Sequence, residues 1–345
     1  MIQNPENSIV IFGGCGFIGI HLAEQFLRSD PSVILFLADL KTEQTFLWPK
    51  LVTEALSKGQ VKILELDVRK KIYHPALPDT AKLIVNLAAV HKQPGHERHE
   101  YFDTNIPGAE NVCTFASEIN CNEIIFTSSI AVYGTDELQP QSKTEQSPPK
   151  PVSPYGQSKF KAESIHEAWA QQGPDRRLII VRPGVIFGHG ENGNVTRMLK
   201  AVIHRYFVYI GNEKVKKAGG YVKELCHSIL WARDQAKDKN IFLYNFTMTP
   251  APTIEEYANE ITEVAKIKKF IPKASFSLLY WTAFIIGKVA KAFGVNSSIN
   301  AERIIKLKQA NIIEPTVLQN LKYNYQYSLH TALSDWKNEW PDDWS

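Results

Sequence analysis

The sequence has few cysteines and no cysteine motif. The four cysteines stand apart, with no CxxC pair and no histidine at metal-ligand spacing: Cys15, Cys113, Cys121 and Cys226. This argues against a structural zinc site and against a disulfide framework. We therefore expect free, buried thiols in a reducing compartment, and no bound metal.

A large charge of one sign is also missing. The 39 basic and 36 acidic residues are mixed along the chain and give a formal net charge of +3. This bias is too weak to indicate a nucleic-acid partner, so none is expected. The N-terminus has no basic stretch followed by an apolar run, so we expect no cleaved signal peptide and a cytoplasmic protein.

No hydrophobic run is long enough to span a bilayer, but one shorter stretch stands out. The 12 residues from Phe276 to Gly287 carry no charge and are followed by Lys288 and Lys291. Two interpretations stay open. The stretch is either a buried or lobe-capping helix, or an amphipathic segment from Phe276 to Lys291 that makes peripheral membrane contact, with its lysines at the headgroups.

The first half of the chain alternates short apolar runs with helical patterns. We expect strands at Ser8–Phe12, 33–38, 61–66, 83–87, Glu123–Thr127 and 178–181, and helices at 20–29, 110–119 and 158–171. Continuous apolar strands that alternate with helices are typical of a parallel sheet covered on both faces.

The fold class predicted from this alternation is α/β. Residues 1–183 are expected to form a Rossmann domain with a doubly wound parallel sheet. Residues 184–345 are expected to form a smaller C-terminal α/β substrate-binding lobe, with some segments interleaved with the first domain. We assign Ile241–Phe246, Ile254–Ala265 and a helical stretch from Phe276 to this lobe.

A glycine turn joins the first expected strand to the first expected helix. Gly13, Gly16 and Gly19 have GxxGxxG spacing, which allows a tight turn and a close approach of the backbone to a pyrophosphate. The N–H groups that follow, at Phe17 and Ile18, lie at the positive end of a helix dipole. The turn therefore predicts a dinucleotide-binding site.

Polar and small residues at the ends of later strands refine this prediction. Asp39 ends the second strand, where a carboxylate accepts both ribose hydroxyls and repels a 2′-phosphate, which favours NAD over NADP. Asp67 and Val68 end the third strand, near the expected adenine. Three small or apolar residues after the fourth strand let the chain pass beside the cofactor: Leu87, Ala88 and Ala89.

A tyrosine and a lysine stand four residues apart at the start of a helix. Tyr155 and Lys159 therefore lie on one face of that helix. A free tyrosine titrates near pH 10, and a nearby ammonium favours the phenolate that acid–base chemistry needs. Ser129, which follows the fifth strand, can supply a hydroxyl that orients the substrate. This set predicts hydride transfer with a Ser-Tyr-Lys site.

The chain resembles the extended short-chain dehydrogenase/reductases, and within them the NAD-dependent epimerase/dehydratase family. The resemblance rests on GGCGFIG, NLAA, SSIAVYG, SPYGQSK and RPGVIFG, in family order, and on GYVKEL further on. It implies that Tyr155 is the acid/base, that Lys159 lowers the pKa of Tyr155 and binds the nicotinamide ribose, and that Ser129 holds the reacting oxygen. It also implies that Asn105 supports the lysine and a water relay, and that the protein is a homodimer.

The residues around this site narrow the reaction. Dehydratases of the family use an Asp-Glu pair just after the catalytic serine or threonine, and Ile130 follows Ser129 here, so a dehydratase is not expected. An epimerase and a 4-keto reductase acting on a nucleotide sugar remain. Val185 stands where epimerases often have an asparagine. His91, Asn194 and Arg197 are candidate substrate contacts.

Two other functions stay open. The apolar stretch after Phe276 is also compatible with a hydroxysteroid or sterol-type dehydrogenase, and with reductases of surface-polysaccharide biosynthesis. A catalytically silent protein that senses NAD and binds partners is disfavoured, because Ser129, Tyr155 and Lys159 are all present.

Overall fold

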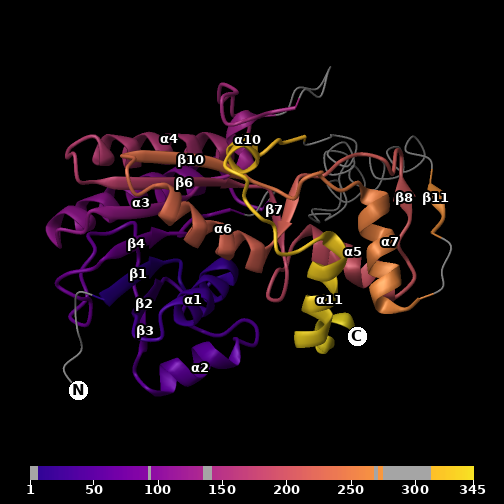
Figure 1. The fold of residues 1–345 in the computed structure, drawn as a ribbon, viewed down its shortest axis with the longest axis horizontal. Coiled ribbons are helices and arrows are strands. Elements are labelled where there is room, and N and C mark those ends of the chain that lie inside the picture. The colour runs from indigo at the N-terminus through magenta and orange to yellow at the C-terminus, as the bar shows by residue number, and fades with distance from the viewer. Residues whose placement is uncertain (1–6, 92–94, 135–141, 268–270, 275–311) are drawn as a thin grey trace, which may run out of the picture.

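The computed structural model describes residues 7–91, 95–134, 142–267, 271–274 and 312–345 (Figure 1). The stretch from Phe276 to Lys291 lies outside these residues, so its two interpretations remain predictions. None of the helices in the described part of the chain combines the length and apolar character that crossing a bilayer requires.

A seven-stranded parallel sheet forms the centre of the larger part of the molecule. Its order is β10-β6-β5-β4-β1-β2-β3. The strands are β1 (Ser8–Phe12), β2 (Ile34–Asp39), β3 (Val61–Glu65), β4 (Leu83–Asn86), β5 (Glu123–Thr127), β6 (Arg177–Pro183) and β10 (Ile241–Phe246). The strand order reverses direction between β1 and β4. In open α/β sheets, ligands bind at the carboxyl ends of the strands beside such a reversal.

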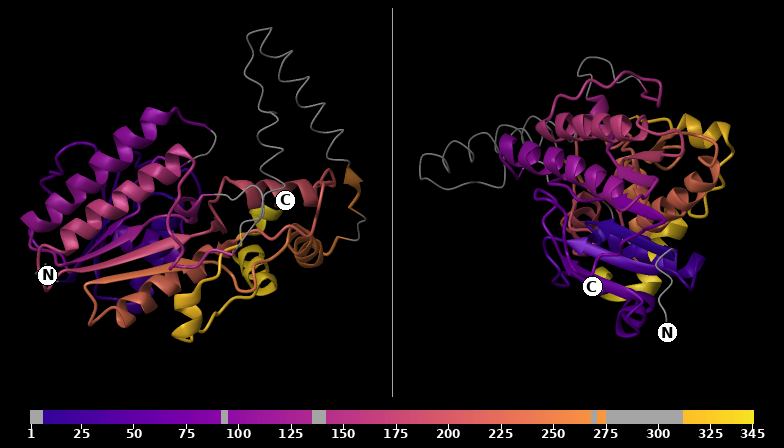
Figure 2. Two further views of the ribbon diagram at one scale, coloured as in Figure 1. Left: turned by 90° about the horizontal axis from the view of Figure 1, so that it is seen from above. Right: turned by 90° about the vertical axis from the view of Figure 1, so that its left-hand side faces the viewer.

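Helices cover both faces of this sheet, as the alternating pattern predicts. One face carries α1 (Phe17–Ser29) and α6 (Val222–Gln235), with α2 (Lys50–Ser57) beside α1. The other carries α3 (Arg98–Glu118) and α4 (Pro154–Ala170), which run side by side in Figure 2. Successive strand residues face opposite ways, so Ile11 belongs to the first core and Val10 to the second.

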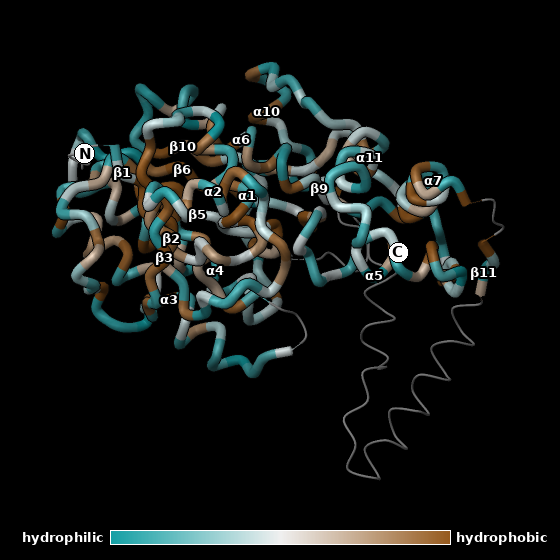
Figure 3. The backbone as a smooth tube through the Cα atoms, turned by 90° about the horizontal axis from the view of Figure 1, so that it is seen from below, coloured by the Kyte–Doolittle hydropathy of each residue, from teal (hydrophilic) through white to brown (hydrophobic). Residues whose placement is uncertain are grey.

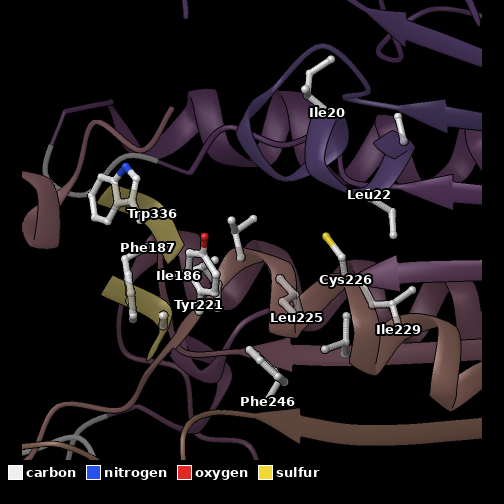
Figure 4. Packing of buried hydrophobic residues seen from close by; sticks show 14 of the residues in the cluster. Ile20, Leu22, Ile186, Phe187, Tyr221, Leu225, Cys226, Ile229, Phe246 and Trp336 are labelled. Carbon is white, nitrogen blue, oxygen red and sulfur yellow. The ribbon is translucent and has the colours of Figure 1, made fainter. Parts of the chain in front are cut away.

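The apolar residues concentrate in the sheet and on the inner sides of these helices. Figure 3 shows the strands as the hydrophobic centre of the larger part, with hydrophilic segments around it. The core between α1 and α6 continues towards the C-terminal helix α11 (Leu329–Glu339), and Figure 4 shows side chains from all three elements. Ile20, Leu225 and Trp336 are each at most 1% exposed there. One continuous core therefore joins the sheet to the C-terminal residues.

Most of the remaining described elements form a smaller part at the other end of the molecule, whereas α10 (Thr316–Asn320) packs on β10 of the main sheet (Figure 1). Two small parallel sheets lie here, β7 (Val185–Phe187) with β9 (Gly219–Tyr221) and β8 (Tyr209–Ile210) with β11 (Lys273–Ala274). The helices of this part are α5 (Asn194–Ile203), α7 (Ile254–Ala265) and α11 (Leu329–Glu339). The structure thus has the smaller α/β lobe that the sequence predicts.

Two expectations about individual elements were wrong. Ile241–Phe246 was assigned to the smaller lobe, but it is β10, the edge strand of the main sheet, paired in parallel with β6. Its apolar side chains complete the core beside α6. The helix expected at 110–119 begins twelve residues earlier, at Arg98, and continues through Pro107. A proline removes one backbone donor and does not always end a helix.

Candidate active site

The glycine turn lies where the ends of three strands meet. The Gly13 amide donates to the Ala38 carbonyl of β2 at 2.8 Å. A Cβ on Gly13 would stand 2.8 Å from the Ala88 nitrogen, so only glycine lets the turn approach the chain after β4. The turn therefore brings predicted cofactor residues from β1 and β4 together, including Leu87, whose amide donates to the Phe12 carbonyl at 2.9 Å.

The N-terminus of α1 is left uncapped by side chains. Its N-cap residue is Gly16, which has no side chain to cap the helix, and no capping hydrogen bond from a side chain is found among the described residues. The first N–H groups of a helix have no partner within the helix, so those of Phe17 and Ile18 are free to bind an anionic group. This agrees with a phosphate site at the start of α1.

Gly19 holds the turn against its helix, which gives a direct test. A Cβ at this position would lie 2.6 Å from the carbonyl oxygens of both Gly13 and Gly14. We expect Gly19→Ala to displace the turn and weaken dinucleotide binding by at least tenfold, measured by titration calorimetry. Gly173→Ala is the matched control, since its nearest neighbour would be 3.6 Å away. Equal affinity in the two variants would contradict this assignment.

The carboxylate of Asp39 is held at the glycine turn. It accepts hydrogen bonds from the Cys15 amide at 3.2 Å and from the Lys41 amide at 3.3 Å. Burial raises the pKa of Asp39, and these backbone hydrogen bonds lower it in part. Asp39 thus stands beside the phosphate turn, at the place predicted for the adenosine ribose.

The predicted adenine contacts are held at the end of β3. The Asp67 carboxylate accepts from Arg69 in a bidentate pair, and this hydrogen bonding lowers the pKa of Asp67. Val68 is buried, and its carbonyl accepts from Asn111 of α3 at 2.8 Å. Hydrogen bonds thus hold both residues at the end of β3.

Gly156 brings the tyrosine to the serine. A Cβ on Gly156 would lie 2.4 Å from the Ala131 carbonyl oxygen, so the start of α4 packs directly on the 3-10 turn that follows β5. Ser129 is the N-cap of that turn, and its side chain accepts from the Ala131 amide at 3.2 Å. Ser153 caps α4 and Pro154 begins it, which fixes the helix start one residue before Tyr155.

Burial shifts the pKa values of both acid–base groups, Tyr155 and Lys159. Burial raises the pKa of Tyr155 to about 12, and the hydrogen bond with Ser129 lowers it in part. Burial also lowers the pKa of Lys159 to about 7, while the charge of Glu163 raises it. Tyr155 keeps part of its surface exposed, whereas Lys159 is only 2% exposed.

Asn105 links the chain after β4 to α4. Its side chain accepts from the Val90 amide at 2.8 Å and donates to Ser158 Oγ at 2.9 Å. Ser158 Oγ in turn donates to the Tyr155 carbonyl at 2.8 Å. Asn105 therefore fixes the helical turn that holds the tyrosine, while its support of the lysine and a water relay stays a prediction.

A buried ion pair behind the site was not among the predicted residues. Arg182 of β6 donates to both carboxylate oxygens of Glu163 at 2.8 and 2.6 Å, and to the Tyr133 hydroxyl at 2.9 Å. Tyr133 then donates to Asn245 of β10 at 2.8 Å. Glu163 follows Lys159 by one helical turn on the inner face of α4. A charged residue at such a position is the sequence signal that points to a buried partner.

The predicted substrate contacts are less closely grouped. His91 is exposed after β4. Asn194 and Arg197 are exposed on α5 and joined by a hydrogen bond of 2.8 Å. Within the described ranges, neither α5 residue forms a hydrogen bond with Ser129 or Tyr155. All three remain predictions.

One group of metal-ligand side chains lies away from this site. Ligand atoms of Glu260, Glu263 and His330 lie within 4.8 Å of one another, on α7 and α11. Glu263 and His330 are exposed, and the His330 ring is hydrogen-bonded to Glu260 at 2.8 Å. We assign no metal to this group, because exposed acidic side chains commonly gather without one.

The model of the NAD dependent epimerase/dehydratase family matches residues 9–245, which include the glycine turn, Ser129, Tyr155 and Lys159. The chain belongs to this family. The predicted resemblance, the enzyme class and the NAD cofactor are thereby confirmed.

Three curated relatives of this family member differ in how much of it they match. The N-acetyl-alpha-D-glucosaminyl-diphospho-ditrans,octacis-undecaprenol 4-epimerase of Escherichia coli O157:H7 is 26% identical over 95% of this chain and 93% of its own. A bifunctional UDP-glucose and UDP-xylose 4-epimerase of Arabidopsis thaliana is 28% identical over 61% of each chain. The sterol-4-alpha-carboxylate 3-dehydrogenase (decarboxylating) of Candida albicans is 24% identical over 96% of this chain and 98% of its own.

A solved structure confirms the fold of this epimerase/dehydratase family member. The UDP-glucuronic acid 4-epimerase of Bacillus cereus, determined in complex with NAD, superposes with a TM-score of 0.72 at 16% identity. The match covers 98% of this chain and 100% of that one. Both the main sheet and the smaller part therefore share an architecture with a known enzyme of this kind.

The residues of this family member fit NAD. Gly13 and Gly19 leave no room for a Cβ, the start of α1 carries no side-chain cap, and the Asp39 carboxylate stands beside the turn. A pyrophosphate would be held by the turn and the N–H groups of α1, and a ribose by Asp39. Lys159 lies further along the same sheet edge, at the start of α4.

Proposed function

We propose that this chain is an NAD-dependent 4-epimerase that acts on a sugar linked to a nucleoside diphosphate. One observation carries the proposal: α4 begins directly on the 3-10 turn that Ser129 caps, which brings Ser129 and Tyr155 together at the sheet edge that bears the glycine turn, with Lys159 one helical turn further on. The 3-10 turn after Ser129 begins Ile130-Ala131-Val132, with no carboxylate for elimination. This supports hydride exchange without dehydration.

The side chains have separate roles in this proposal. Ser129 holds the reacting oxygen of the sugar, and Tyr155 takes its proton and later returns it. Lys159 binds the nicotinamide ribose, and its charge favours the phenolate of Tyr155. Bound NAD supplies the position that accepts a hydride and gives it back.

The remaining cofactor and substrate contacts belong to the same proposal. Gly13, Gly16, Phe17, Ile18 and Gly19 hold the pyrophosphate. Asp39 holds the adenosine ribose, Asp67 and Val68 meet the adenine, and the chain from Leu87 through Ala89 passes beside the cofactor. His91, Asn194 and Arg197 contact the substrate.

A lipid carrier is the second candidate, because of how the relatives match. The relative named as acting on an undecaprenol-linked sugar matches 95% of this chain, whereas the UDP-sugar epimerase matches 61%. The sugar diphosphate is common to both carriers. Proton transfer at Tyr155 would be unchanged, and the part of the chain beyond the main sheet would decide which carrier is bound.

The test is a substrate screen on the purified full chain. UDP-N-acetylglucosamine, UDP-glucose and a polyprenyl-diphosphate N-acetylglucosamine are incubated separately, and sugar isomers are followed by NMR. We expect a 4-epimer to form from one carrier class, with no net change in NADH absorbance. Stoichiometric NADH turnover would instead identify a reductase or dehydrogenase. A sterol carboxylate is run in parallel, since the sterol dehydrogenase is also matched over nearly its full length.

The domain division, the cellular location and the oligomeric state of the enzyme are also part of this proposal. The division at residue 183 would separate cofactor binding from substrate binding, with α6 and β10 returning to the cofactor part. A cytoplasmic homodimer in polysaccharide biosynthesis fits the family resemblance and the relatives. Peripheral membrane contact from Phe276 to Lys291 would suit a lipid-linked substrate.

A further inference from the structure

The inner face of α4 carries three titratable groups. Lys159, Glu163 and His166 lie at intervals of three and four residues, and they are 2%, 1% and 0% exposed. Burying such groups is costly unless each has a partner. Glu163 has Arg182 as its partner, and His166 is hydrogen-bonded at both ring nitrogens. The group that stabilises the buried ammonium of Lys159 has still to be identified.

Lys159 has an aromatic ring where an acceptor would be expected. Its Nζ lies 4.3 Å from the centre of the Phe126 ring. In the part of the chain that the structure describes, we find no hydrogen bond or ion pair of this ammonium. The face of an aromatic ring attracts a cation, most strongly when the pair is removed from water. Phe126 is 1% exposed, so this condition is met.

A second ring is stacked on Phe126. The His166 imidazole lies 4.2 Å from the phenylalanine ring, with 16° between the planes. Each face of the Phe126 ring has room for one group at about 4 Å, so the ammonium and the imidazole cannot share a face. Lys159 and His166 are also two helical turns apart, about 10 Å along α4. We therefore place the ammonium and the imidazole on opposite faces of Phe126.

The hydrogen bonds of His166 fix it as a neutral ring. Nδ1 lies 2.7 Å from the Ala162 carbonyl, so this nitrogen carries the proton. Nε2 lies 3.2 Å from the Asn86 side-chain nitrogen and accepts from it. Burial lowers the pKa of His166 to about 4, and the charge of Lys159 lowers it further. The ring therefore puts no second cation behind Phe126.

We propose that Phe126, backed by His166, is a positioning residue that holds the charged ammonium of Lys159 at the edge of the cofactor site. Its ring face takes the place of a hydrogen-bond acceptor and leaves the three ammonium protons free for the nicotinamide ribose. This inference rests on the proposed role of Lys159.

The other groups around Lys159 leave this role to the ring. On α4, Tyr155 is neutral near pH 7. The charge of Glu163 raises the pKa of Lys159, but both oxygens of that carboxylate accept from Arg182 of β6 and not from the ammonium. On β4, Asn86 carries no charge. On α3, Asn105 is also uncharged and bonds to Ser158. No unpaired carboxylate of these elements is recorded beside the ammonium in the described structure.

The test is a direct titration of Lys159 in the full chain, with and without saturating NAD. Lysine labelled with carbon-13 at Cε is followed by NMR, and the Lys159 resonance is assigned by its loss in Lys159→Arg. We expect Phe126→Leu to lower the midpoint of Lys159 by about one pH unit. The matched control is Phe115→Leu, the same change at a buried phenylalanine that packs on Phe12. It should leave the midpoint unchanged.

A purely structural role for Phe126 would destabilise the protein without moving this titration. A midpoint in Phe126→Leu that equals or exceeds that of the unaltered protein would overturn the proposal. If Phe126→Leu does not fold, Phe126→Met fills more of the space and makes the same prediction. The titration needs neither substrate nor turnover, so its failure is distinct from a failure of the epimerase proposal.

Discussion

Replacing Tyr155 with phenylalanine is expected to lower turnover by about 10³-fold while NAD stays bound. The change removes one oxygen, the group that exchanges a proton with the sugar hydroxyl. The ring itself packs near Tyr101, at 6.2 Å between centroids, and phenylalanine keeps this packing. The glycine turn and Asp39 are untouched. The measurement is the rate of epimer formation, with NAD content determined after denaturation.

Tyr101→Phe is the control for this result. It removes a neighbouring phenol oxygen but leaves Ser129, Tyr155 and Lys159 unchanged. We expect this variant to keep turnover within about tenfold of the unaltered protein. Retention of full activity in Tyr155→Phe would exclude the tyrosine as acid and base, whatever substrate the screen identifies.

Replacing Arg182 with methionine is expected to have the largest effect on stability. Arg182 and Glu163 are 4% and 1% exposed, and two hydrogen bonds join them. Removing the guanidinium leaves a carboxylate in the core without its counter-ion, which costs about 3 kcal/mol or more. The Tyr133 hydroxyl also loses a donor. Chemical denaturation followed by circular dichroism measures the change.

The double variant Glu163→Leu with Arg182→Met separates charge from packing. Replacing both members of a buried pair by apolar residues is often neutral, because no charge is then left unpaired. We expect it to recover most of the stability lost in Arg182→Met. If the double variant is as unstable as the single one, the loss comes from packing between α4 and β6.

Much of the fold follows from local patterns in the sequence. Ser8–Phe12 and Glu123–Thr127 are continuous apolar runs with turn residues after them, and the structure has both strands with those bounds. Asp39 could be placed because its strand ends at the edge where the glycine turn lies. These features depend on residues close together in the chain, so periodicity is enough to find them.

Features that depend on distant residues were not predicted. The place of Ile241–Phe246 in the main sheet is decided by pairing with Arg177–Pro183 after a long excursion of the chain. The ring of Phe126 looks like ordinary core in the sequence. Its contact with Lys159 appears only once α4 lies across β5. Such contacts are set by tertiary packing, which a single sequence read by pattern does not contain.

The late arrival of β10 has a consequence for synthesis. In the described part of the chain, one edge of β6 pairs with residues 241–246 alone, so this edge stays open while some sixty further residues are being made. An unpaired apolar strand edge is a template for wrong pairing between chains. Nascent chains that stop between residues 183 and 246 should therefore be the ones that chaperones retain, and ribosome-bound chains should become protease-resistant only after Phe246 has emerged.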